Sequence, residues 1–130
     1  MTRVLLVGLL PEAVDYSDPA LPPGMNAEKI QAGIDLGLAQ MTARGWRAET
    51  CLILPDATAG PTVERTLSAA RYDCVVVGAG VRLPPRNLLL LETVVNAVHK
   101  AAPGTPIAFN TTPQDSADAA ARWVSAVHEH

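Results

Sequence analysis

The stretch Cys74-Val75-Val76-Val77-Gly78 decides the fold class. An unbroken apolar run that ends in glycine is typical of a strand buried on both faces of a parallel sheet. The run Arg3-Val4-Leu5-Leu6-Val7-Gly8, nearer the N-terminus, has the same form and predicts a second central strand. Strands buried on both faces need helices on both sides of the sheet, so we expect strands and helices to alternate along the chain.

The rest of the chain fits this alternation. Two more strands are expected at residues 47–54 and 106–110, which are also bounded by turn residues. Apolar residues at helical spacing fill the segments between strands. They predict a first helix capped by Asn26 and ended by Gly45, a second that opens at Gly60-Pro61, a third from Arg86 to Ala102, and a fourth that starts at Thr112-Pro113.

Right-handed crossovers leave two natural strand orders, 2-1-3-4 and 3-2-1-4. We favour 2-1-3-4, because it puts the mixed-polarity segment Arg47-Ala48-Glu49-Thr50 at an edge and the two most apolar strands in the centre. The predicted fold is a three-layer α/β/α domain with a four-stranded parallel sheet, a flavodoxin-like or Rossmann-like layout that spans residues 1–130. The first and fourth helices should share one face, and the second and third helices the other.

Composition argues against several classes of function. Hydrophobic residues make up 48% of the chain but aromatic residues only 4%, so the core must be aliphatic. The net charge of −3 disfavours a nucleic-acid partner, which needs a basic face, and equally a basic helix on a membrane surface. Cys51 and Cys74 both lie in apolar runs, without a CxxC motif, so we expect buried, reduced thiols in a cytoplasmic protein.

A ligand site is expected at the carboxyl ends of the strands. In an open parallel sheet, ligands bind where the strand order reverses, which in the order 2-1-3-4 lies between the first and third strands. The chain brings there two strand ends with glycines, the long proline-rich loop of residues 9–24, and the polar end of the fourth strand. The predicted ligand-binding residues are Gly8, Tyr16, Gly78, Gly80, Arg82, Asn110 and Thr111.

The segment Gly78-Ala79-Gly80-Val81-Arg82 indicates the class of ligand. Glycines let the backbone approach a ligand closely, and backbone N–H groups with a guanidinium can hold a phosphate or carboxylate. We therefore expect a small anionic molecule; the alternative is a tight turn with a solvated Arg82. The loop after Gly8 lacks the glycine fingerprint of a dinucleotide site, so Asp56 is expected to serve a turn or helix start. Neither a metal nor a particular cofactor is predicted.

Two other functions remain open from the sequence. Acidic residues in the first loop leave room for acid–base catalysis, although no activated nucleophile is evident. The predicted third helix is apolar around nearly its whole circumference, whereas a sheet buries one stripe of a helix. We expect a second copy of the chain to cover the outer face through Leu89, Leu90 and Val94, which would make a non-catalytic homo-oligomeric module the alternative function. A wide core stripe is the other explanation.

Overall fold

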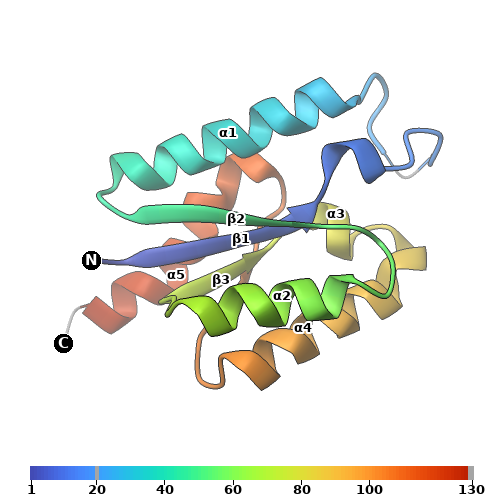
Figure 1. Cartoon of the computed structure of the whole chain (residues 1–130). Helices are drawn as coiled ribbons and strands as arrows, with labels where there is room; N and C mark the ends of the chain where they lie inside the picture. The colour runs from blue at the N-terminus through green and yellow to red at the C-terminus, as the bar shows by residue number, and fades with distance from the viewer. Residues whose placement is uncertain (20, 129–130) are drawn as a thin grey trace.

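The computed structural model describes residues 1–19 and 21–128 and has the expected three-layer architecture. A single parallel sheet has the order β2-β1-β3-β4. Its strands are β1 (Arg3–Leu9), β2 (Arg47–Ile53), β3 (Cys74–Val77) and β4 (Ile107–Phe109). The long helices are α1 (Ala27–Ala43), α2 (Ala59–Ala69), α4 (Leu88–Ala101) and α5 (Ser116–His128). The α1 and α5 helices pack together on one face of the sheet, and α2 and α4 on the other, as expected (Figure 1).

Helix ends follow local chemistry. The Asn26 side chain accepts the Lys29 N–H at 2.9 Å and caps α1, and Gly45 follows this helix with a φ of +84°. The α2 helix begins at Ala59, slightly earlier than expected, so Pro61 is not its first residue. Pro61 is the third residue of α2 and is still tolerated there, because the first four N–H groups of a helix have no partner within it and proline lacks an N–H. Asp56 accepts the Thr58 N–H at 2.8 Å in the preceding turn, which is the structural use expected for it.

Residues 79–82, which lie between the third expected strand and the third expected helix, form the short helix α3 (Ala79–Arg82). The Val81 N–H donates to the Gly78 carbonyl, and the Leu83 N–H donates to the Ala79 carbonyl. Val81 is fully buried, so turning the backbone here delivers an apolar side chain to the core. Three 3₁₀ turns complete the described elements: η1 (Pro11–Ala13), η2 (Pro85–Asn87) and η3 (Pro113–Asp115).

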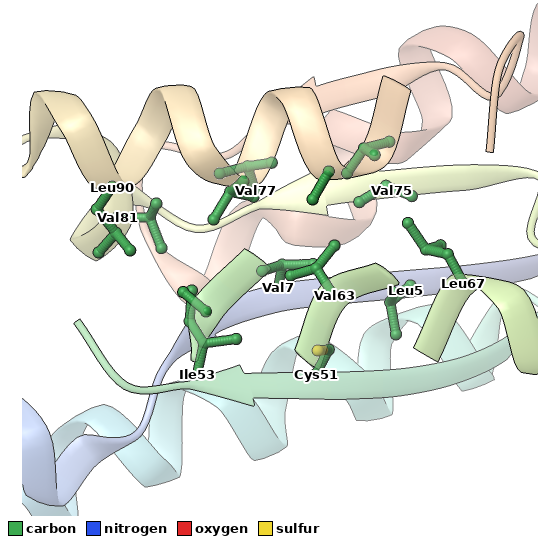
Figure 2. Packing of buried hydrophobic residues seen from close by; sticks show 14 of the residues in the cluster. Leu5, Val7, Cys51, Ile53, Val63, Leu67, Val75, Val77, Val81 and Leu90 are labelled. Carbon is green, nitrogen blue, oxygen red and sulfur yellow. The ribbon is translucent and has the colours of Figure 1, made fainter. Parts of the chain in front are cut away.

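The sheet separates two apolar clusters. Leu5 and Val7 of β1 face α2 and α4, whereas Val4 and Leu6 face α1 and α5. Helices cover both faces of β1, and this explains why its sequence is a continuous apolar run. Figure 2 shows the first cluster, in which α2, α3 and α4 contribute side chains that pack on the sheet.

The two cysteines lie in different clusters and are both buried, as expected. Cys51 faces α2 and α4, whereas Cys74 faces α1 and α5. Because they lie on opposite faces of the sheet, the fold does not bring the two thiols together. Burial raises the pKa of Cys74 to about 12, so its thiol is protonated at neutral pH.

The structure corrects two of the residues expected at an intermolecular contact. Leu90 is only 9% exposed and Val94 is fully buried, and both belong to the core of this chain. The α4 helix packs against α2 as well as against the sheet side chains, so it needs apolar residues on two sides. On α4, the exposed leucines are Leu88 and Leu89, at 61% and 75%. Among the described helices, none is both long and apolar enough to span a membrane.

A close approach between α1 and the turn before α5 explains a glycine on α1. A Cβ atom added at Gly37 would overlap the carbonyl oxygen of Pro113. We expect Gly37→Ala to lower the free energy of unfolding by about 1–2 kcal/mol, because backbone displacement outweighs the better helix propensity of alanine. Urea denaturation measures this change. The control is Gly80→Ala, whose added Cβ meets no atom within 4 Å. Equal losses in both variants would contradict the packing argument.

Candidate functional site

A cavity of about 720 Å³ lies at the carboxyl end of the sheet. Gly8 and Gly78, at the ends of β1 and β3, both line it. The chain that follows β1 leads to α1 on one face, and the chain that follows β3 leads to α4 on the other (Figure 1). This is the point where the strand order reverses, and the diverging connections leave space between them.

Glycine at position 78 suits this crowded junction. The Gly78 N–H donates to the Val7 carbonyl at 2.8 Å, and an added Cβ would lie 3.2 Å from the same oxygen. A side chain here would press on the neighbouring strand, so the close spacing of β1 and β3 at the cavity depends on a small residue. Gly80, two residues later, lines the cavity in open space.

Apolar side chains form most of the cavity wall. The sheet provides Leu6 and Leu52, and α1 provides Ile30 and Ile34. The segment between β1 and α1, which the sequence indicated as a long loop, adds Leu21 and Met25. An apolar wall of this kind favours a ligand that buries hydrocarbon or aromatic surface.

Asn110 forms a polar part of the wall and is 1% exposed. Its side-chain oxygen accepts the Ala79 N–H at 2.7 Å, and its Nδ2 donates to Ser116 Oγ at 2.9 Å. The Ser116 hydroxyl in turn donates to the Pro113 carbonyl at 2.8 Å. Asn110 therefore connects the chain after β3 to the start of α5 beside the cavity.

Thr111 and Thr112 continue the polar wall and are held by Asp115. The Asp115 carboxylate accepts the N–H groups of Thr111 at 2.9 Å and Thr112 at 3.2 Å, and also the Thr111 hydroxyl. Partial burial acts to raise the pKa of Asp115, but these hydrogen bonds outweigh it and the pKa is lowered. The helix start expected at Thr112 is therefore present, with Asp115 as its acidic partner.

Arg86 lines the cavity and forms ion pairs with two aspartates that also line it. One guanidinium nitrogen lies 3.1 Å from Asp15 Oδ2, and another lies 3.0 Å from Asp18 Oδ2. Hydrogen bonds from the Ser17 hydroxyl and N–H, together with Arg86, lower the pKa of Asp15. Sequence reasoning missed Arg86, because it follows two prolines and lies outside the strand ends where ligand residues are expected.

Five predicted ligand residues line the cavity, whereas Tyr16 and Arg82 are not among its described lining residues. The Tyr16 hydroxyl donates to the Pro11 carbonyl at 2.6 Å. Arg82 Nη2 donates to the Asn110 carbonyl at 2.5 Å, and its guanidinium carbon lies 5.8 Å from the centre of the Phe109 ring. Ligand binding by the five residues stays a prediction, and the lining gives no support to an anion site built on Arg82.

Two comparisons with known proteins find no match for this chain. No model of a known protein family matches it, and no curated protein matches it with significant sequence similarity. Function is therefore inferred from the chemistry of the cavity.

Proposed function

We propose that this domain binds a small organic molecule in the cavity beside Gly8 and Gly78. The observation that carries the proposal is a cavity of about 720 Å³ at the switch point of the sheet. Small-molecule sites are typically about 300–1,000 Å³ and mainly apolar, with a few polar groups that fix orientation. Leu52, Ile34 and Met25 provide apolar wall, and Asn110 and Thr111 provide the polar part.

The polar groups of the wall favour binding over catalysis as the primary role. Asn110 and Asp115 hold backbone N–H groups in place. Asp15 and Asp18 are both paired with Arg86, so acid–base catalysis by either carboxylate would first require it to leave this partner. A shaped apolar cavity with fixed polar groups at one side is suited to holding a ligand.

A neutral fluorescent dye tests the proposal. N-phenyl-1-naphthylamine fluoresces more strongly in apolar surroundings, and we expect saturable binding to the folded protein. Gly80→Leu should weaken binding about tenfold or more, equivalent to about 1.4 kcal/mol, because Gly80 lines the cavity and has open space for a side chain. Fluorescence titration of both proteins measures the two dissociation constants.

The matched control is Ala39→Leu, which adds a leucine at an exposed position of α1. This variant should bind the dye as the unmodified protein does. Thermal unfolding of both variants checks that the fold is intact. If the Gly80→Leu variant binds the dye with unchanged affinity, the dye does not occupy this cavity and the proposal is wrong.

A homo-oligomeric module is the second candidate function, and one observation favours it. Leu83, Leu88 and Leu89 lie close together in the chain and are 58%, 61% and 75% exposed. Large apolar side chains at an exposed position are what an intermolecular contact requires. With Leu90 and Val94 in the core, these three leucines are the residues on which an oligomer hypothesis rests.

A further inference from the structure

Three charged side chains from two segments of the cavity wall form one cluster. Asp15 and Asp18 come from the segment between β1 and α1, and Arg86 comes from η2, after β3. The ion pairs of 3.1 and 3.0 Å join these two segments, and we call the three residues the Arg86 clasp. The clasp therefore borders the same space as the apolar wall.

The clasp contains more negative than positive charge. One guanidinium faces two carboxylates, and these are the charged side chains among the lining residues that the structure describes. Two nearby cations are directed elsewhere: Lys29 Nζ donates to the Gly24 carbonyl at 2.9 Å, and Arg82 donates to the Asn110 carbonyl. The positive charge in the wall is thus already paired, with one carboxylate in excess.

This charge arrangement treats neutral and anionic ligands differently. An uncharged molecule can occupy the cavity and contact its apolar wall without breaking the ion pairs of the clasp. An anion must either lie near the excess carboxylate or displace Asp15 or Asp18 from Arg86. Both routes are unfavourable, because an anion in the apolar cavity loses hydration without meeting an unpaired cation among the described lining residues, and because a displaced carboxylate loses its ion pair with Arg86.

We infer that the cavity takes an uncharged, mainly apolar molecule and that the Arg86 clasp rejects an anion of the same shape. This inference rests on the proposed function and names the class of its ligand. It replaces the anionic class expected from Arg82, which is not among the described lining residues of the cavity; its Nη2 donates to the Asn110 carbonyl, and its Nε is buried without a hydrogen-bond partner.

A pair of dyes that differ by one sulfonate provides the test. N-phenyl-1-naphthylamine is neutral, and 8-anilinonaphthalene-1-sulfonate has the same ring system with a negative charge. We expect the unmodified protein to bind the neutral dye about tenfold or more tightly than the sulfonate in low-salt buffer, measured by fluorescence titration. The ratio of the two dissociation constants is the quantity that reports on the clasp.

Two variants should change this ratio in opposite directions, and a third should leave it unchanged. The double variant Asp15→Asn/Asp18→Asn leaves Arg86 unpaired and should narrow the ratio about three- to tenfold, whereas Arg86→Gln should widen it by a similar factor. Lys100→Gln is the control, because it removes the same unit charge from the exposed Lys100–Glu64 pair, which does not line the cavity. This control should keep the ratio of the unmodified protein.

The outcomes separate the inference from the proposed function. The inference is overturned, while small-molecule binding stands, if the unmodified protein binds both dyes equally well. The same holds if the ratio of the two dissociation constants does not change in the expected direction in the clasp variants. If neither dye binds the unmodified protein, the proposed function is wrong, and the inference with it. If the Gly80→Leu variant binds the dyes as tightly as the unmodified protein does, the dyes occupy a different site, and both the proposed function and the inference are overturned.

Discussion

Leu90→Glu is expected to unfold the domain, whereas Leu89→Glu leaves it folded. Leu90 packs in the cluster with Val77 and Val81 (Figure 2). It is 9% exposed, whereas Leu89 is 75% exposed. Removing a buried leucine costs about 2–5 kcal/mol, and burying a carboxylate without a partner adds to this cost. The sum is a large part of the 5–15 kcal/mol that stabilises a typical domain.

Circular dichroism and chemical denaturation measure the contrast, and the two adjacent leucines control for each other. Sedimentation velocity of Leu89→Glu adds a separate result. If the exposed leucines join two copies of the chain, this variant should be a folded monomer where the unmodified protein is an oligomer. A Leu90→Glu variant that keeps the stability of the unmodified protein would show that Leu90 is not part of the core.

The fold could be predicted because its signals are local and redundant. The runs that end at Gly8 and Gly78 are apolar throughout, which only a strand covered on both faces explains well. Mixed polarity in β2 then placed this strand at an edge, as the observed order confirms. Asn26 and Gly45 marked the ends of α1 through chemistry that depends on neighbouring residues alone.

The direction of individual side chains could not be predicted in the same way. Arg82 lies two residues after Gly80, but the unexpected α3 helix turns it toward the Asn110 carbonyl and Phe109. Leu90 was expected on an outer face, yet α4 has two buried sides because α2 packs beside it. Both outcomes depend on contacts between segments that are far apart in the sequence.

The cavity could be placed from the sequence, but its chemistry could not. The switch-point rule located it at Gly8, Gly78 and Asn110. Part of its apolar wall and the two carboxylates of its ion pairs come from the segment between β1 and α1, whose path no periodic pattern defines. The pairing of Arg86 with Asp15 and Asp18 joins residues about seventy positions apart, so it requires the folded chain.

Asn110→Ala is expected to have the second-largest effect and tests whether the polar wall is structural. The change removes the acceptor of the partly buried Ala79 N–H and the buried donor to Ser116 Oγ. Leaving buried polar groups without partners costs about 1–3 kcal/mol each, so we expect the free energy of unfolding to fall by about 2–4 kcal/mol. Urea denaturation measures this loss.

Asn87→Ala is the matched control, because Asn87 also lines the cavity and its side chain donates to the Gly80 carbonyl at 3.1 Å. Asn87 is only partly buried, so water can replace its hydrogen bond and the loss should stay below about 1 kcal/mol. Hydrogen exchange at the Ala79 amide should be faster in Asn110→Ala than in Asn87→Ala, because only the first change removes the acceptor of this N–H. Similar stability of Asn110→Ala and Asn87→Ala would mean that the Asn110 network does not hold the cavity in shape.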